Sequence, residues 1–277
     1  MASMLEVKNL RVSFPTHRGR VEVVKGISFD LGRERLGIVG ESGSGKSMTG
    51  RAILKLIRKP GLVTADRLAF DGVDILEQSD KQMRAIRGAR ISMVMQDPKF
   101  SLNPVMTVGE QIAEALVTHE KLPRRAVNER IMNMLEAVRI NDPKRVAGLY
   151  PHEVSGGMGQ RVMIAMMLIP GPELLIADEP TSALDVSVQA QVLDIIDDLV
   201  TTKGMGLILI SHDLNLVSRY CDRILVMNSG TVVEECAAEE LANARHPYTR
   251  GLLAAMPTID ESRDELPVLD RSQWAGT

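Results

Sequence analysis

Alternating hydrophobic and polar positions open the chain and predict a pair of strands. Residues 5–14 and 22–31 both alternate in this way, and a two-residue period is typical of a strand with one buried face. A short apolar run at residues 35–39 predicts a strand that leads into a glycine-rich loop. Residues 68–70, followed by Asp71-Gly72, indicate a further strand that enters a tight turn.

The pattern changes in the middle of the chain. Between residues 108 and 147, apolar side chains recur at helical spacing, as in Ile112 with Leu116 and Ile131 with Leu135. We expect this block, over about residues 98–168 and including the helix after Gly157, to form a helical subdomain inserted into an α/β core.

Strands and helices alternate on both sides of this block. The expected strands are residues 91–95, 174–177, 206–211 and 223–227, and the expected helices are residues 48–57, 188–200 and a segment after Asp213. Such alternation is typical of a largely parallel sheet. Past about Ala237 we expect two short helices, and then a charged, proline-containing tail from Thr258 that is poorly ordered.

Composition narrows the class of protein. The 277 residues fit one nucleotide-binding core with an inserted subdomain or tail, and 44% hydrophobic residues supply a sizeable core. A formal net charge of -3 argues against a protein that grips nucleic acid by its phosphates. Two cysteines, Cys221 and Cys236, offer no disulfide framework and suit a reducing compartment. We see no signal peptide, and the apolar stretch at residues 162–170 is too short to span a bilayer, so we expect a cytosolic chain.

A glycine-rich loop between a predicted strand and a predicted helix carries the first chemical motif. Residues 40–47, the phosphate loop, read GESGSGKS and fit the pattern G-x-x-x-x-G-K-[ST]. Glycines let successive backbone N–H groups point at phosphate oxygens, and the following helix adds the positive end of its dipole. Lys46 should neutralise β- and γ-phosphate charge, and the Ser47 hydroxyl should bind Mg²⁺. The expected nucleotide-binding residues of the loop are Gly40, Ser42, Gly43, Gly45, Lys46 and Ser47.

Two acids follow the apolar strand at residues 174–177. Beside a phosphate loop, Asp178 would hold Mg²⁺, and Glu179 would polarise the attacking water as general base, a role worth ~10²–10⁴-fold in rate. The alternative is that these acids only cap the next helix. His212 and Gln96, each directly after a predicted strand, are candidates for contacts with the γ-phosphate and with Mg²⁺ or the water. A structural histidine and an ordinary loop glutamine are the alternatives for these two.

The segment from Val154 to Arg161 reads VSGGMGQR and resembles the signature motif of ABC ATPases, usually LSGGQ. Together with the phosphate loop, Gln96, the acidic strand end, Asp185 in the sequence SALD, and His212, six motifs occur in the order of that family. The resemblance covers residues 4 to 256. It implies a P-loop NTPase core of the α/β class with a mostly parallel sheet, an antiparallel β subdomain and an inserted helical subdomain.

The same resemblance implies domain limits and a subgroup. We expect an ABC ATPase domain over residues 1–257 and a short C-terminal extension over residues 237–277. The stretches MQDPKFSLNPVMTVGEQI, ADEPTSALDVSVQAQVLDII and HPYTRGLLAAMP are similar to the ATPases of oligopeptide, dipeptide and nickel importers. Such importers often use two different ATPase subunits, and the SGGM form resembles the first of the pair.

Residue roles follow from the resemblance. ATP would lie between two ATPase subunits, with Ser155 and Gly157 of one subunit contacting the γ-phosphate held by Lys46 of the other. Asp185 would lie at the subunit contact, and the segment after Gln96 would touch the membrane subunits. Phe14 would stack on adenine, or else be a plain core phenylalanine.

Partners and cofactors are implied in the same way. The expected partners are a second ATPase subunit with an SGGQ signature, two transmembrane permease subunits and an external solute-binding protein, with the chain at the cytoplasmic face of the inner membrane. ATP and Mg²⁺ are the expected cofactors. We expect no iron–sulfur cluster, because no cysteine follows Cys236. Met158 and Gly159 depart from the usual signature, which could slow hydrolysis. Peptides, nickel chelates, opines and glycosidic conjugates all remain compatible substrates.

Other function classes predict different sequences. A DNA-repair ATPase of this family would need a long coiled coil between residues 47 and 154, and that segment is short and lacks sustained heptads. A translation-associated relative would carry two ATPase cores. A non-hydrolysing regulatory subunit is the remaining rival, although Glu179 and His212 are both present.

Overall fold

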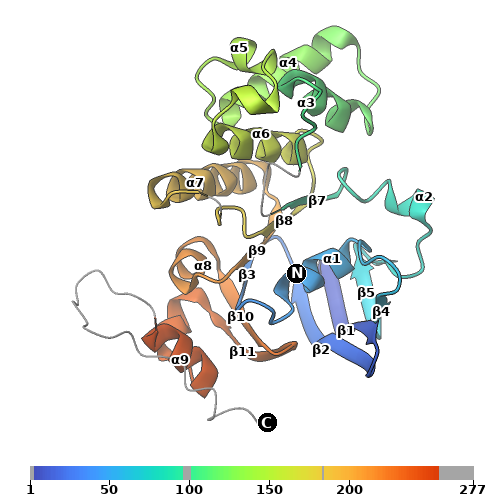
Figure 1. Cartoon of the computed structure of the whole chain (residues 1–277), viewed down its shortest axis with the longest axis vertical. Helices are drawn as coiled ribbons and strands as arrows, with labels where there is room; N and C mark the ends of the chain where they lie inside the picture. Colours follow the sequence, from blue (N-terminus) through green and yellow to red (C-terminus); the bar gives the residue numbers. More distant parts are fainter. Residues whose placement is uncertain (1–2, 96–100, 183, 256–277) are drawn as a thin grey trace. The chain divides into compact units, whose positions relative to one another are not determined.

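The computed structural model describes residues 3–95, 101–182 and 184–255, with the elements labelled in Figure 1. The described residues form two compact units. The first contains the residues up to Val73 and those from Leu209 onward, and the second is Asp74–Ile208. The expected contribution of Gln96 and the expected disorder of the tail from Thr258 both lie outside the described residues.

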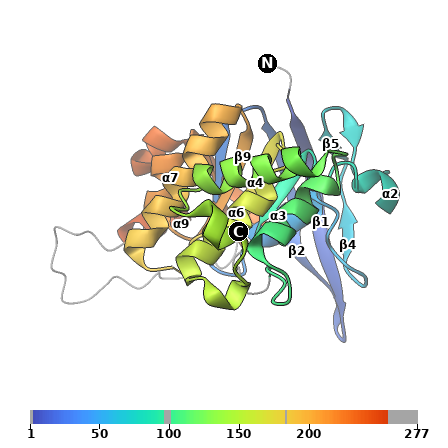
Figure 2. The same ribbon diagram turned by 90° about the horizontal axis from the view of Figure 1, so that it is seen from above.

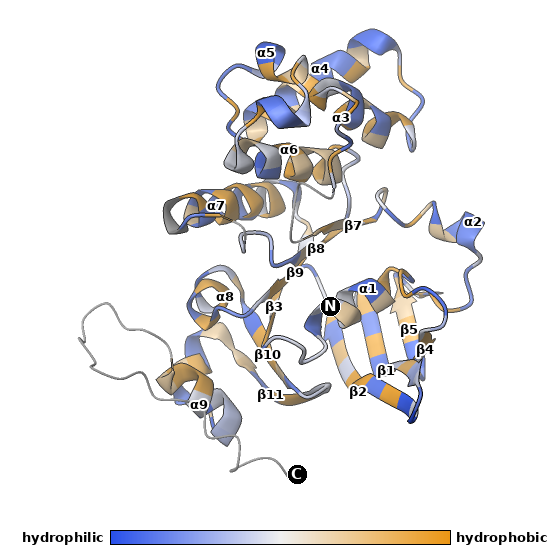
Figure 3. Ribbon diagram, viewed as in Figure 1, coloured by the Kyte–Doolittle hydropathy of each residue, from blue (hydrophilic) through white to orange (hydrophobic). Residues whose placement is uncertain are grey.

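An antiparallel sheet opens the first unit. Strands β1 (Leu5–Thr16) and β2 (Gly19–Leu31) pair from Leu5↔Leu31 to Thr16↔Gly19. Strands β4 (Leu62–Thr64) and β5 (Arg67–Phe70) also pair antiparallel to β1, and the two-residue β6 (Val73–Asp74) follows. Figure 3 shows hydrophobic and hydrophilic positions alternating along β1 and β2. This alternation buries one face of the sheet and confirms the predicted antiparallel strands.

The first unit also contains strands of a second sheet, in the order β11-β10-β3. Strand β3 (Arg35–Val39) runs parallel to β10 (Arg223–Asn228), and β11 (Thr231–Ala237) is antiparallel to β10. The helices are α1 (Lys46–Ile53), α8 (Leu214–Tyr220), the 3-10 helix η3 (Ala238–Asn243) and α9 (Pro247–Ala254). Strand β9 (Gly206–Ser211) spans the division between the units along the sequence.

The second unit places helices around a parallel strand pair. Strands β7 (Ile91–Val94) and β8 (Leu174–Asp178) pair in parallel and are buried along their whole length, as their largely apolar sequences predict. The helices are α2 (Asp80–Met83), α3 (Val108–Val117), α4 (Arg124–Ala137), α5 (Pro143–Ala147), the 3-10 helix η2 (Pro151–Glu153), α6 (Gly156–Leu168) and α7 (Val186–Lys203). Figure 2 shows α3, α4 and α6 packed beside one another.

Local chemistry explains where these helices begin and end. Helix α3 starts at a capping box, in which the Thr107 hydroxyl accepts the Glu110 N–H and the Glu110 carboxylate accepts the Thr107 N–H. Helix α7 ends at Gly204, whose φ of 60° is the left-handed conformation that glycine adopts readily. None of the described helices is long and apolar enough to cross a membrane.

Two details differ from the pattern in the sequence. Helix α1 stops at Ile53 instead of continuing to residue 57, because Lys55 turns to a positive φ of 52°. Strand β11 was not predicted, because the polar residues Glu234 and Glu235 interrupt the hydrophobic alternation in TVVEECA. The strand forms nevertheless, because β10 offers it an antiparallel ladder from Arg223↔Ala237 to Asn228↔Thr231, with one register shift between Val226 and Met227.

Candidate functional site

The phosphate loop joins β3 to α1, and its glycines are required by its geometry. Gly40, Gly43 and Gly45 have φ angles of 150°, 84° and 102°, which side chains with a Cβ adopt only with strain. A Cβ on Gly40 would also collide with the carbonyl oxygen of Met227, and one on Gly45 would lie 2.5 Å from that of Val23. The glycines at both ends of the loop therefore allow it to pass close to neighbouring backbone.

Lys46 is buried at the start of α1 and folds back over the loop. Its side chain is 4% exposed, and its ammonium group donates to the carbonyl oxygens of Gly40, at 2.7 Å, and Glu41, at 2.9 Å. Both of these carbonyl oxygens are neutral acceptors. Phosphate oxygens are stronger acceptors for such a group.

Of the three serines in the phosphate loop, Ser42 is exposed, and Ser44 and Ser47 are at least half-buried. The Ser44 hydroxyl is buried without a hydrogen-bond partner among the described residues, and such an orphaned polar atom indicates an acceptor or donor supplied by a ligand. Ser47, the second residue of α1, is half-buried. Its hydroxyl is the kind of oxygen ligand that Mg²⁺ prefers.

The two acids lie at the carboxyl end of β8 in the second unit. Asp178 is 4% exposed, and Glu179 is half-buried with a φ of 47°. A left-handed conformation costs a non-glycine residue on the order of 1–3 kcal/mol and is concentrated at functional sites. Helix α7 has Asp185 as its N-cap, so the alternative that Asp178 or Glu179 caps the next helix is wrong.

The signature segment forms an exposed helix start. Ser155 is the N-cap of α6, and its hydroxyl accepts the Met158 N–H at 3.3 Å. Ser155 and Gly156 are exposed, and Gly157 is half-buried with its Cα facing Val188, so that a Cβ would lie 3.1 Å from that side chain. An open helix N-terminus with glycines in its first turn suits an anion brought from outside the chain.

A contact that the sequence did not indicate connects the signature helix to the segment after Glu179. Gln160 is 1% exposed, and its side-chain amide donates a short hydrogen bond to the carbonyl oxygen of Pro180. Its carbonyl oxygen has no partner among the described residues. The first turns of α6 are therefore fixed to the loop that carries the candidate base, and only the long-range packing shows this.

Three further predicted residues are His212, Asp185 and Phe14. His212 is exposed directly after β9, and the next residue, Asp213, caps α8 by accepting the Asn215 and Leu216 N–H groups. Asp185 is exposed and makes no side-chain cap bond, which leaves its carboxylate available for a contact outside the chain. Phe14 lies half-buried on β1 with its ring against Gly61.

The division into units separates these residues into two sets. The first unit carries Phe14, the phosphate loop and His212, and the second carries Ser155, Gly157, Asp178, Glu179 and Asp185. Within the first unit the loop residues are brought together around Lys46. Within the second, the signature helix and the acidic strand end are brought together by Gln160.

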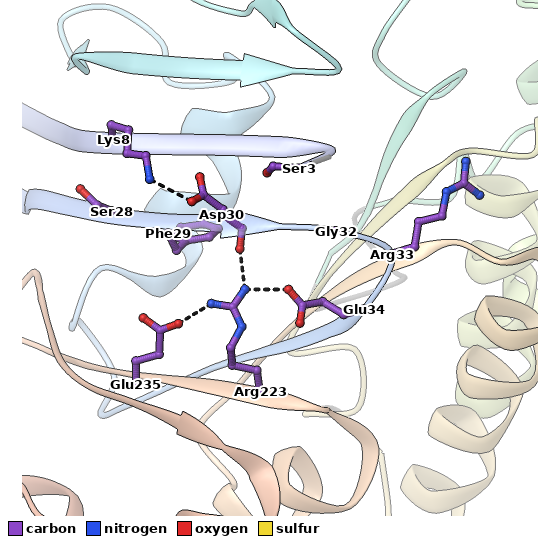
Figure 4. A pocket seen from close by; sticks show the side chains of 10 residues that line it. All are labelled: Ser3, Lys8, Ser28, Phe29, Asp30, Gly32, Arg33, Glu34, Arg223 and Glu235. Carbon is purple, nitrogen blue, oxygen red and sulfur yellow. Dashed lines mark hydrogen bonds and ion pairs between the residues drawn. The ribbon is translucent and has the colours of Figure 1, made fainter. Parts of the chain in front are cut away.

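A separate hollow of about 560 Å³ in the first unit is lined by paired charges (Figure 4). Lys8 pairs with Asp30 at 2.9 Å, and Arg223 pairs with Glu34 at 2.7 Å and with Glu235. Burial opposes the charged form of Arg223, but these two glutamates raise its pKa above the ordinary value. Because Lys8 and Arg223 are already paired with carboxylates, this hollow is a poorer phosphate site than the phosphate loop.

Comparisons with known proteins agree with this geometry. The family model described as ABC transporter matches residues 24–182. The oligopeptide transport ATP-binding protein OppD of Bacillus subtilis (strain 168) is 48% identical over 95% of this chain and 74% of its own length. The dipeptide transport ATP-binding protein DppD of the same organism is 45% identical over 98% of this chain and 82% of its own length. A solved dimeric, post-hydrolysis structure of the ATP-binding cassette MJ0796 with ADP and Pi has a TM-score of 0.76 and 26% identity, and it covers 85% of this chain and 99% of that one.

Proposed function

This chain belongs to the ABC transporter family and is an ATPase of that family, and from that premise we propose that it powers the import of peptides or a related small solute. The observation that carries the proposal is the phosphate loop closed around a buried Lys46, in a chain that is 48% identical to an oligopeptide transport ATP-binding protein. Nickel chelates and opines are the related solutes that this proposal includes.

Each residue has a definable part in ATP hydrolysis. Lys46 binds the β- and γ-phosphates, while Ser47 and Asp178, both oxygen donors, hold Mg²⁺, with Gln96 as a further ligand. Bound Mg²⁺ would neutralise the charge that develops on the phosphate oxygens. Glu179 takes the proton of the attacking water, and His212 contacts the γ-phosphate. Phe14 presents the exposed part of its ring to the adenine.

A second ATPase subunit completes the site in this proposal. Ser155 lies exposed and Gly157 half-buried at the open start of α6, so they can reach a nucleotide held by another chain. Asp185, whose carboxylate does not cap its own helix, lies at the same contact. We propose a different chain with an SGGQ signature as the partner, because the SGGM form resembles the first ATPase of a two-ATPase importer.

The transport partners follow from the same proposal. Two permease subunits would hold the chain at the cytoplasmic face of the cell membrane, and an external binding protein would deliver the solute. Substrate choice then lies in those proteins, since the chain itself contributes ATP chemistry and a docking surface after Gln96.

An uptake assay tests the proposed function. Cells that lack this chain should lose uptake of a labelled dipeptide, oligopeptide or nickel chelate, and the wild-type chain should restore it. Glu179→Gln should fail to restore uptake, whereas the matched variant Glu239→Gln, at an exposed position on η3, should restore it fully. Unchanged uptake of all these solutes in cells that lack the chain would show that it does not power their import.

A further inference from the structure

Helix α9 touches the phosphate loop through one buried tyrosine. The Tyr248 hydroxyl accepts a hydrogen bond from the Glu41 N–H at 3.0 Å, across 207 residues of sequence. Tyr248 is completely buried in the first turn of α9, within the same unit as the loop. Helix α9 therefore supplies a hydrogen-bond acceptor, held in place, for the backbone of the loop that is expected to hold phosphate.

The contact falls on a peptide group that Lys46 also holds. The carbonyl oxygen of Gly40 accepts from Lys46 at 2.7 Å, and the N–H of Glu41 donates to Tyr248 at 3.0 Å. This carbonyl and this N–H belong to one planar peptide group and point in opposite directions. Hydrogen bonds at both ends fix the orientation of that plane.

Tyr248 is itself held firmly in place. The Glu234 carboxylate on β11 accepts the N–H of Arg245 at 2.6 Å and that of His246 at 3.3 Å, and His246 Nδ1 accepts the N–H of Tyr248 at 3.2 Å. Burial raises the pKa of Glu234, but the backbone N–H groups of Arg245 and His246 that donate to it help to bring that pKa below the ordinary value. The carboxylate is therefore charged at neutral pH and anchors the start of α9.

We propose that Tyr248 is a positioning residue of the phosphate loop, which holds the Gly40–Glu41 peptide in its binding orientation when Lys46 leaves it for the phosphates. An ammonium group that turns to phosphate gives up at least part of its bonding to the Gly40 and Glu41 carbonyls. The Tyr248 hydroxyl then remains as the anchor of that peptide group. This inference rests on the proposed nucleotide role of Lys46.

The consequence is that helix α9, through the Tyr248 hydroxyl, increases the affinity of the loop for nucleotide. A loop that is already in its binding orientation loses less conformational freedom when ATP arrives. Without the hydroxyl, the Glu41 N–H lacks this acceptor, and the Gly40–Glu41 peptide group is held less firmly. Binding ATP must then restore its orientation.

Tyr248→Phe tests the proposal, because it removes the hydroxyl and keeps the ring. We expect the Kd for MgATP, measured by calorimetry on the purified chain, to rise about three- to tenfold, the loss typical of one hydrogen bond. The midpoint of thermal unfolding should stay close to the wild-type value. The matched control is Tyr220→Phe, the same change at a buried tyrosine of α8 in the same unit, which should leave the Kd unchanged.

Two variants together distinguish a failure of this inference from a failure of the proposed function. If Lys46→Ala binds MgATP as well as the wild type does, the nucleotide site itself is wrongly placed and the inference fails with it. If Lys46→Ala loses MgATP while Tyr248→Phe binds it like the wild type, only the role of Tyr248 is overturned. Hydrogen exchange of the wild-type chain tests the proposal without depending on the folding of a variant. The Glu41 amide should exchange with solvent as slowly with MgATP bound as without it, and faster exchange in the bound form would contradict the proposal.

Discussion

Glu179→Gln should bind ATP and hydrolyse almost none of it. The amide has nearly the shape of the carboxylate but cannot accept a proton from water at neutral pH. Loss of a general base typically costs ~10²–10⁴-fold in rate. The variant should therefore keep its ATP affinity and accumulate as a closed, ATP-bound pair of subunits.

The structure indicates that this change leaves the fold intact. Glu179 is half-buried after β8 with a φ of 47°, and glutamine meets the same backbone requirement as glutamate. Phosphate release gives the rate, and gel filtration with ATP gives the assembly state. The control Glu239→Gln removes the same charge elsewhere and should turn over ATP normally. If Glu179→Gln hydrolysed ATP at the parental rate, another group would be the base.

Lys46→Ala should lose ATP affinity. Lys46 is 4% exposed, and its ammonium group lies against the Gly40 and Glu41 carbonyl oxygens of the phosphate loop. Hydrogen bonds to charged groups contribute about 1.5–3 kcal/mol each. We therefore expect the Kd for ATP to rise about ten- to a hundredfold, in contrast to the retained affinity of Glu179→Gln.

Equilibrium binding of a fluorescent ATP analogue measures this difference. Lys81→Ala, at an exposed position on α2, removes the same charge and should bind like the wild type. Because Lys46 is buried, the unfolding midpoint of each variant should be measured beside the Kd. A folded Lys46→Ala with wild-type affinity would rule out the phosphate loop as the site of nucleotide binding.

Much of the fold follows from local patterns in the sequence. The buried parallel strands β7, β8 and β9 were predicted, because strands covered on both faces are continuous apolar runs. The early end of α1 was missed, since it depends on the positive φ of Lys55. Strand β11 was missed because its partner strand, rather than its own pattern, decides its structure.

The candidate site likewise has a part that the sequence predicts and a part that it does not. The phosphate loop could be predicted because its residues are neighbours in sequence and because its backbone has positive φ angles that favour glycine. The left-handed conformation of Glu179 carries no sequence signal, since glutamate rarely adopts it. The bonds from Gln160 to Pro180 and from Glu41 to Tyr248 join residues 20 and 207 positions apart. Such contacts are decided by packing, which no local pattern records.

In this account a second subunit completes the ATP site, since Ser155 lies exposed and Gly157 half-buried at the open start of α6. The most direct measurement is the rate of ATP hydrolysis per chain over a hundredfold range of protein concentration. We expect a low rate in dilute solution that rises with the concentration of the chain or of an added second ATPase subunit, and that Ser155→Ala in the contributing subunit lowers. Full turnover that is independent of concentration, in a chain that remains monomeric, would contradict the account.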